Sequence, residues 1–328
     1  MLFKVLGFVA IAVLIQLALG FGLTLSQSPK DLSKDLSEDG GLVFVDLVAR
    51  GAADPLPLEP VAMRDGWQMP VRRLAAQDKP LLVLIHGSGW HGQQFDRLAK
   101  ALEGRAEVLA PDLRGHGATP QRRGDIDHIP QFEEDLADLI AHYRKPGQRL
   151  VVAGHSSGGG LALRFAAGPE AQGVDHVILM APFLKYNAPT TRANSGGWAH
   201  VLKRRMIGLS ILNMMQIRAL NHLPVIQFAM PRAVLEGSMG HTATTACSYR
   251  LNTGYAPRSD YKGDIAALPD FTVIVGDKDE AFFADQYKPL MAPLNPRGRY
   301  VIVDGQNHLG VVDAPKTLQQ IEKVLDGL

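Results

Sequence analysis

The stretch that decides the fold is Leu150-Val151-Val152-Ala153-Gly154-His155-Ser156-Ser157-Gly158. Its first four residues are apolar and predict a buried strand, and the run 161–167 after the glycines predicts a helix. A serine inside G-x-S-x-G at a strand-to-helix junction fits a nucleophile elbow, in which the serine takes strained backbone angles. Only small neighbours such as Gly154 and Gly158 avoid a clash in so tight a turn. A plain glycine-rich turn is the alternative, but the flanking strand and helix favour the elbow.

Two further motifs follow the elbow in the order serine, acid, histidine. The apolar run 271–275 predicts a strand that leads into Gly276-Asp277-Lys278-Asp279-Glu280. The run 300–303 predicts another strand, which leads into Asp304-Gly305-Gln306-Asn307-His308. Because loops after parallel strands meet at the carboxyl edge of a sheet, a carboxylate and a histidine are expected close to Ser156.

The residue types suit acyl transfer. A serine hydroxyl is a poor nucleophile at neutral pH, so Ser156 needs a base, and His308 is the candidate. A buried carboxylate orients such a histidine and stabilises its cation. Two N–H groups must also bind the developing oxyanion. We assign them to Ser157, after the nucleophile, and to Ser88 after the strand 81–85, with Gly89 as the alternative to Ser88.

The chain alternates predicted strands and helices, which indicates an α/β fold with a mostly parallel central sheet and helices on both faces. A possible first strand lies at 42–47, and Asp65-Gly66 turns a hairpin between 61–64 and 69–74. The further expected strands and helices are 81–85, 93–102, 107–110, 131–143, 150–153, 159–167 and 176–180. A terminal helix with one apolar face closes the chain.

This alternation stops between residues 183 and 265. So long a connection must have structure of its own. We expect a helical cap at 183–265, inserted after the sixth core strand, over a catalytic core formed by 42–182 and 266–328. Half of the ten methionines lie in this segment, and flexible thioethers suit an adaptable apolar pocket, although packing of the cap onto the core explains many of them equally well. Lys203, Arg204 and Arg205 are expected on an exposed helix face, and contact with lipid phosphates is the alternative.

The N-terminus predicts a membrane segment. Residues 5–25 are almost wholly apolar, long enough to span a bilayer and longer than an ordinary signal-peptide core. We expect 1–25 to be an uncleaved single-pass anchor followed by a linker at 26–41, with the catalytic part on the exported side. Cleavage near Ala18-Leu19-Gly20 and secretion is the alternative. Lys30 and Lys34 favour the opposite orientation.

Composition excludes several classes of function. A net charge of +1 gives no electrostatic reason to expect nucleic acid. Cys247 is the single cysteine, so no intramolecular disulfide can form. None of the eleven histidines has a metal-ligand spacing, and no nucleotide-binding glycine motif follows a strand, so no metal and no cofactor are expected. The sequence carries no signal for an oligomeric state.

These motifs together resemble the α/β-hydrolases of the monoacylglycerol lipase and lysophospholipase group, which is also grouped with the S33 serine aminopeptidases. The resemblance rests on His86-Gly87-Ser88-Gly89, Pro111-Asp112-Leu113-Arg114-Gly115-His116-Gly117, the elbow, Gly276-Asp277-Lys278-Asp279 and Asn307-His308. It implies that the acid is Asp279, the aspartate of a G-x-x-D pattern, with Asp277 and Glu280 as competitors. His86, His116, His155, Asp112 and Arg114 are expected to support the site and not to touch substrate.

The expected function is serine-dependent hydrolysis of carboxylic esters, such as a monoacylglycerol or a lysophospholipid, with Ser156, Asp279 and His308 as the catalytic triad. The expected partners are a small-molecule or lipid ester and a membrane. An aminopeptidase or amidase is an alternative, which would hold the amine of its substrate with a carboxylate such as Glu236 or Asp264. A ligand-binding protein without turnover is another.

Overall fold

The computed structural model describes residues 2–32, 41–45 and 54–328, and its centre is one sheet. Within this part of the chain the sheet has eight strands in the order β1-β2-β4-β3-β5-β6-β10-β11. The strands are β1 (Leu58–Ala62), β2 (Gln68–Leu74), β3 (Leu81–Ile85), β4 (Glu107–Pro111), β5 (Leu150–His155), β6 (His176–Met180), β10 (Asp270–Gly276) and β11 (Gly298–Val303). The pairs β1–β2 and β2–β4 are antiparallel, and all the other pairs are parallel.

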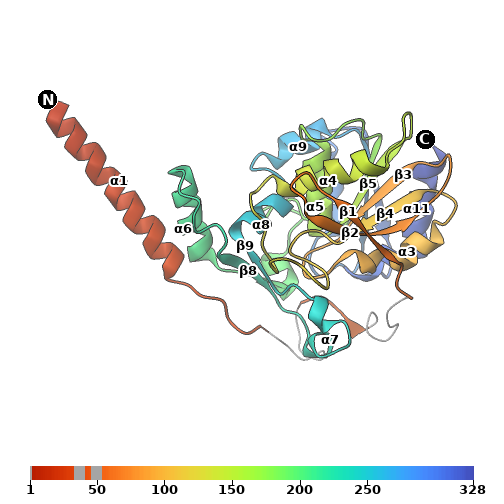
Figure 1. Ribbon diagram of the computed structural model, residues 1–328, viewed down its shortest axis with the longest axis horizontal. Coiled ribbons are helices and arrows are strands. Elements are labelled where there is room, and N and C mark those ends of the chain that lie inside the picture. The colour runs from red at the N-terminus through yellow and green to blue at the C-terminus, as the bar shows by residue number, and fades with distance from the viewer. Residues whose placement is uncertain (1, 33–40, 46–53) are drawn as a thin grey trace.

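Helices cover both faces of this sheet, which confirms the predicted α/β architecture (Figure 1). The strands β3, β4 and β5 are buried at every position, because a parallel sheet between two helical layers excludes water from both sides. The helical elements of the body are η1 (Gly92–Phe95), α3 (Asp96–Ala101), α4 (Gln131–Tyr143), α5 (Ser157–Ala166), α9 (Tyr261–Ala267), η4 (Ala284–Gln286), α10 (Tyr287–Met291), η5 (Gly310–Asp313) and α11 (Pro315–Asp326). This scaffold brings the carboxyl ends of β3, β5, β10 and β11 to one edge.

The segment between β6 and α9 differs from the helical cap that we expected. It holds η2 (Ala193–Gly197), β7 (Ala199–Val201), α6 (Lys203–Met214), β8 (Pro224–Phe228), α7 (Arg232–Leu235), η3 (Gly240–Thr242), β9 (Ala246–Ser248) and α8 (Tyr249–Tyr255). The three strands pair as an antiparallel sheet in the order β7-β8-β9. The segment is therefore mixed and not purely helical. The expected boundary at 265/266 falls inside α9, a helix that packs against α5 of the body.

The strand expected at 42–47 is wrong in its described part. Leu42–Phe44 joins no strand, and Asp46 and Leu47 lie outside the described residues. Phe44 is buried instead against Trp198, with 5.7 Å between the ring centroids. Its ring partner lies far along the chain, so Phe44 is buried by tertiary packing and not by strand pairing. The hairpin expected around Asp65-Gly66 is confirmed by β1 and β2.

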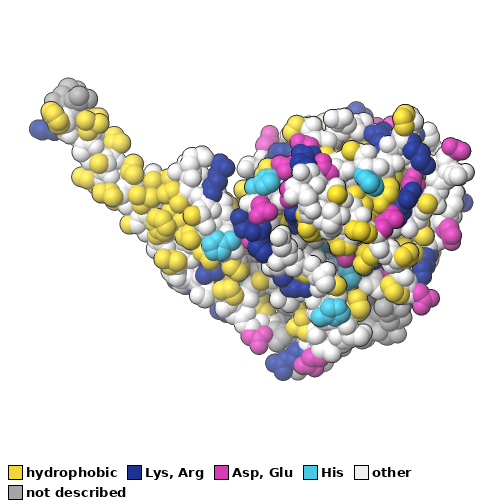
Figure 2. Space-filling model, in the orientation of Figure 1, with side chains coloured by type: hydrophobic (Ala, Val, Ile, Leu, Met, Phe, Trp, Pro, Cys, Tyr) yellow, Lys and Arg dark blue, Asp and Glu magenta, His cyan; other side chains and the backbone are white. Residues whose placement is uncertain are grey.

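The N-terminal helix α1 (Leu2–Leu25) projects away from the body (Figure 1). Its surface is almost entirely apolar (Figure 2), and Phe3–Leu25 is long and apolar enough to cross a membrane. The helix is therefore a candidate membrane anchor, although a signal sequence has the same character. In the described part of the expected linker, Gln227 of β8 binds both the N–H and the carbonyl of Lys30.

Candidate active site

Ser156 stands in a strained turn between β5 and α5. Its backbone angles are φ 56° and ψ −120°, a combination that residues other than glycine rarely adopt. The two elbow glycines are required by space, since a Cβ on Gly154 would lie 2.1 Å from the carbonyl oxygen of Gly158. A Cβ on Gly158 would lie 2.2 Å from the carbonyl oxygen of Ile85. The turn therefore lifts the hydroxyl of Ser156 above the sheet edge, as the sequence pattern predicts.

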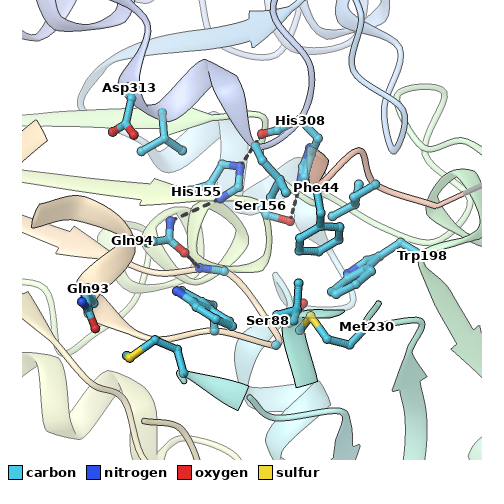
Figure 3. A pocket seen from close by; sticks show the side chains of 18 of the residues that line it. Phe44, Ser88, Gln93, Gln94, His155, Ser156, Trp198, Met230, His308 and Asp313 are labelled. Carbon is cyan, nitrogen blue, oxygen red and sulfur yellow. Dashed lines mark hydrogen bonds between the residues drawn. The ribbon is translucent and has the colours of Figure 1, made fainter. Parts of the chain in front are cut away.

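A hydrogen-bonded line connects Ser156 with His308 and Asp279 (Figure 3 shows the first two). The Nε2 atom of His308 lies 3.0 Å from Oγ of Ser156, and Nδ1 lies 2.8 Å from Oδ2 of Asp279. The other oxygen of Asp279 accepts 2.8 Å bonds from the N–H groups of Ala281 and Phe282. Because both oxygens are bonded and buried, the carboxylate holds one orientation toward His308. Such a line can withdraw a proton from the serine hydroxyl.

The two competing carboxylates do not reach Nδ1 of His308. Asp277 is partly exposed and lies 4.0 Å from the ammonium of Lys278. Glu280 instead receives the N–H of His308 on Oε2 and the N–H of Val43 on Oε1, each at 2.8 Å. Glu280 therefore holds the backbone of the His308 loop and ties it to the segment that carries Phe44. No sequence motif indicates this bridging role, because it depends on two loops that are distant along the chain.

Ser88 and Ser157, the residues expected to bind the oxyanion, both lie beside Ser156. Both residues line the smaller of two cavities at the nucleophile, and Ser157 donates its hydroxyl to Oγ of Ser88 at 3.0 Å. Ser157 is the first residue of α5, where N–H groups have no partner inside the helix. The loop after β3 and the start of α5 thus present N–H groups that can bind an oxyanion. Gly89, the alternative to Ser88, lines the larger cavity.

A chain of hydrogen bonds connects the loop after β3 with the loop of His308. Gln94 accepts the N–H of Gly87 at 3.2 Å, so its amide nitrogen faces Nδ1 of His155 at 3.3 Å. The Nε2–H of His155 then donates to the carbonyl oxygen of His308 at 2.9 Å. Burial, reinforced by the nearby His308, lowers the pKa of His155 to about 3, so this ring stays neutral at physiological pH. His155 supports the site as expected, and Gln94 is an additional positioning residue that the sequence did not reveal.

The remaining histidines of the resemblance are also structural. Leu113 donates its N–H to Nε2 of His86 at 3.1 Å, and Nδ1 of His86 donates to the carbonyl of Gly87 at 2.8 Å. Burial lowers the pKa of His86 far below its ordinary value. Burial also lowers the pKa of His116, to about 4, and its Nδ1 bonds the carbonyl of Arg114. Both imidazoles therefore brace loops as neutral rings.

Asp112 and Arg114 likewise brace the loop after β4. Burial alone would raise the pKa of Asp112, but hydrogen bonding to His91 and the charge of Arg72 lower it to about 2. Arg114 forms a two-point ion pair with Asp135, with N–O distances of 2.7 and 2.9 Å. These buried pairs hold the loop after β4 in place.

Two cavities meet at Ser156, and their walls are mostly apolar (Figure 3). The larger has a volume of about 280 Å³ and the smaller about 60 Å³. Trp198 borders both, and its ring stacks on Phe228 with the centroids 5.3 Å apart. The apolar side chains of the larger cavity are Leu42, Phe44, Trp90, Trp198, Met230, Ala233, Val234, Met239, Leu309 and Val312. Sequence reasoning placed methionines near the site but missed Leu42, Phe44 and Trp198.

The carboxylates expected for an amine-binding site lie elsewhere. Asp264 is buried and pairs with Arg258 at 3.0 Å, and Glu236 is exposed beyond α7; neither lines a cavity at Ser156. Asp313 lines the larger cavity in their place, together with Arg97. Across the described residues, no group of three histidine, cysteine, aspartate or glutamate side chains is placed to hold a metal ion.

Comparison with known proteins places this site in context. The chain is 42% identical over 90 residues to the pimeloyl-[acyl-carrier protein] methyl ester esterase of Chromobacterium violaceum, a match that covers 27% of this chain and 32% of that protein. The chain likewise spans about a third of the length of the other curated relatives that it matches most strongly.

Solved structures share the fold over most of the chain. A soluble variant of monoglyceride lipase from Saccharomyces cerevisiae superposes with a TM-score of 0.63 at 17% identity, covering 84% of this chain and 95% of that one. A membrane phospholipase A described as a bacterial virulence factor superposes with a TM-score of 0.58 at 22% identity, covering 99% and 97%. The family model of the serine aminopeptidase S33 group matches residues 76–249, more than half of the chain, and the protein is therefore an α/β-hydrolase of this family.

Proposed function

We propose that the protein is a serine hydrolase that cleaves carboxylic esters through an acyl-enzyme on Ser156. The observation that carries this proposal is the line of 3.0 and 2.8 Å contacts from Ser156 through His308 to Asp279. Ser156, at one end of this line, lies between two cavities. A ligand-binding protein without turnover would not need a strained serine aligned with a base and a buried acid.

In the first half-reaction, Oγ of Ser156 attacks the ester carbonyl carbon and its proton passes to Nε2 of His308. The negative charge on the carbonyl oxygen is bound by the N–H groups of Ser88 and Ser157, and Asp279 stabilises the imidazolium. Collapse of the intermediate breaks the ester bond, and the leaving alcohol takes the proton from His308. A water molecule, deprotonated by the same imidazole, then attacks the acyl-enzyme and releases the acid.

The proposed substrate is a lipid-like ester, such as a monoacylglycerol or a lysophospholipid. Ten apolar side chains line the larger cavity, so it favours an acyl chain over a polar group. Met230 and Met239 give its wall adaptable thioethers. The relative from Chromobacterium violaceum is named as an ester esterase, which supports the same reaction class for this chain.

We further propose that α1 is retained as a membrane anchor, with the catalytic part on the exported side. The apolar surface of α1 supports anchoring. We also propose that the chain divides into a core at 42–182 and 249–328 and a cap at 183–248 over the site. The cap ends before α8 in this division, because α8 and α9 pack on α5 of the core.

The test uses the full chain in detergent micelles and a fluorophosphonate probe that phosphonylates activated serines. Intact-mass analysis should show one adduct, absent in Ser156→Ala and present in Ser259→Ala, a substitution of an exposed serine away from the cavities. The same proteins are then assayed on monoacylglycerols and lysophospholipids of rising chain length. Turnover that peaks on medium or long chains and disappears in Ser156→Ala supports the proposal. Full turnover by Ser156→Ala contradicts it.

An amidase is the second candidate, favoured by one observation. Asp313 places a carboxylate in the wall of the larger cavity, where it can bind the free amine of a peptide. Aminoacyl amides therefore belong in the same panel, together with the variant Asp313→Asn. Serine-dependent cleavage of amides that Asp313→Asn impairs, with indifference to lipid esters, would assign the protein to this branch.

A further inference from the structure

Helix α1 does not stand alone, because its C-terminal part is packed against α6 of the inserted segment (Figure 1). The contact is close at Gly208: a Cβ added there would lie 2.6 Å from the carbonyl oxygen of Gly20 and 2.5 Å from Oγ1 of Thr24. Thr24 is completely buried in this contact. Leu17 extends the contact toward the N-terminus by packing on the cluster that contains Leu209 and Leu212. Small residues thus bring two backbones together, as in helix pairs within membranes.

The two helices run in opposite directions. The neighbours of Gly20 include Leu212, while Thr24 accepts a 3.2 Å bond from Nε of Arg205 on its carbonyl oxygen. Beyond the end of α1, Gln27 accepts the N–H of Arg204 at 3.0 Å. As α1 comes out toward the body, α6 therefore returns along it toward the N-terminal end of α1.

The length of α1 determines whether the part of it that packs on α6 lies within the hydrocarbon core of a bilayer. A helix of 24 residues is about 36 Å long, and the hydrocarbon core of a bilayer is about 30 Å thick. Only residues 2–16 precede the paired part, and they extend about 22 Å. This unpaired part is too short to cross the core by itself. If α1 spans the bilayer, its paired part lies within the hydrocarbon, and α6 lies there beside it.

The surface of α6 agrees with such a position. Ile207 and Met214 are 53% and 81% exposed, and their spacing of seven residues places them on one face of the helix. Lys203 and Arg204 are exposed in the first turn, level with Gln27, where the headgroup phosphates would lie. Arg218 is exposed on the turn after α6, and because a charge deep in hydrocarbon is costly, it limits how far this end of α6 can enter the bilayer.

We propose that α6 is a second lipid-contacting element: α1 and α6 enter one bilayer as an antiparallel pair, with Ile207 and Met214 against acyl chains and Lys203 and Arg204 against phosphates. The occupant of this exposed apolar face is a lipid bilayer, because the face continues the surface of α1 and ends in basic residues. The proposal does not depend on the hydrolytic reaction and requires only that α1 inserts.

Single-cysteine labelling of the full chain tests this proposal. Cys247 is the single native cysteine, and burial raises the pKa of its thiol, so it does not compete for a maleimide. A bimane maleimide is attached at Met214→Cys, at Leu14→Cys on α1, or at Tyr186→Cys, which is 76% exposed on the loop after β6. The proteins are placed in vesicles of phosphatidylcholine and phosphatidylglycerol that contain a doxyl-labelled phosphatidylcholine. We expect severalfold stronger quenching at 214 than at 186, comparable with that at 14.

Every other pattern overturns the paired insertion. Quenching at 14 with no more at 214 than at 186 leaves α1 as the only inserted element. Protection of the label at 214 from both lipid quencher and aqueous iodide assigns the face to a second copy of the chain. Absence of quenching at 14 would contradict both the membrane insertion of α1 and the paired insertion of α1 and α6.

A matched pair of glycine variants tests whether docking carries α6 into the lipid. Gly208→Ala places a methyl group against the backbone of α1, while Gly22→Ala places one where nothing lies within 4 Å. We expect Gly208→Ala to reduce quenching at 214 and leave it unchanged at 14, and Gly22→Ala to change neither. Undiminished quenching at 214 in Gly208→Ala would show that α6 reaches lipid without α1 and would overturn the pair.

Discussion

The loops at the carboxyl edge of the sheet and the segment inserted between β6 and α9 are built in different ways. In the loops, directed hydrogen bonds orient each side chain, as with the two amides that bind Asp279 and the amide of Gln94 that binds His155. In the inserted segment, the walls of the cavity are apolar and held by packing, as with Trp198 stacked on Phe228. Directed bonds give one geometry for the reaction, whereas packing gives a surface that can change with the ligand. We therefore expect substitutions in the loops to change turnover, and substitutions in the inserted segment to change substrate choice.

The largest effect should come from Asp279→Asn, which keeps the shape of the side chain and removes its charge. We expect kcat to fall about 10⁴-fold, because the amide no longer stabilises the imidazolium of His308. Ester hydrolysis by the full chain, with a melting curve as the control for folding, measures this. A drop of less than about tenfold would mean that the acid is another residue, and Glu280→Gln is the variant to compare.

Gln94→Ala tests the connection between the two catalytic loops. It removes the acceptor for the N–H of Gly87 and the donor to His155, so both loops gain freedom. A misplacement of about 1 Å can cost about 10²-fold, so we expect kcat to fall between about 10-fold and 10²-fold with KM nearly unchanged. Gln93→Ala, an adjacent amide for which no bond to these loops is found in the described residues, is the matched control. A rise in KM at constant kcat would assign Gln94 to substrate binding.

Trp198→Ala tests whether the inserted segment determines substrate choice. The substitution removes a side chain that borders both cavities, so the space beside Ser156 becomes larger. The hydrogen bonds of Ser156, His308 and Asp279 do not involve Trp198. We expect kcat/KM to change by about 10-fold between short and long acyl esters, since a pocket discriminates a methylene by about 1–3 kcal/mol. An equal loss on all chain lengths would show that the inserted segment supports the chemistry as well.

The smallest effect concerns stability and pH. In the unfolded chain a histidine has its ordinary pKa of about 6.5, but burial lowers the pKa of His116 to about 4. The unfolded state therefore binds more protons below pH 6.5, so the free energy of unfolding falls as the pH drops from 6.5 toward 4. The contribution is at most about 3 kcal/mol. Thermal melts of the wild type and of His116→Asn between pH 7 and 4 should converge as the pH falls, and parallel curves would contradict this origin.

The sequence predicted the parts of the site that local motifs encode. The elbow depends on Gly154 and Gly158 next to Ser156, and the loops of Asp279 and His308 follow runs of apolar strand residues. Each of these signals spans a few neighbouring residues. The three loops lie close together because the carboxyl ends of parallel strands meet at one edge of the sheet.

The parts that escaped prediction all depend on contacts between distant residues. Phe44 lies in the stretch 42–47 for which a strand was predicted, yet it packs on Trp198 in the cavity wall. The strands β7, β8 and β9 are short, and two of them have only three residues, too few to show a period. The role of Gln94 and the docking of α1 on α6 come from tertiary packing, for which one sequence carries no pattern.

Glu280 connects the loop of His308 with the chain segment that contributes Phe44 to the cavity wall. One of its oxygens holds the backbone of His308 and the other holds the backbone next to Phe44, so a single carboxylate joins the base to the cavity wall. We expect a bulky acyl group that displaces Phe44 to pull on the loop that presents the imidazole. In the proposed reaction, substrate size and rate would then be coupled through Glu280, and a variant selected for larger esters would have to keep this carboxylate or replace its two hydrogen bonds.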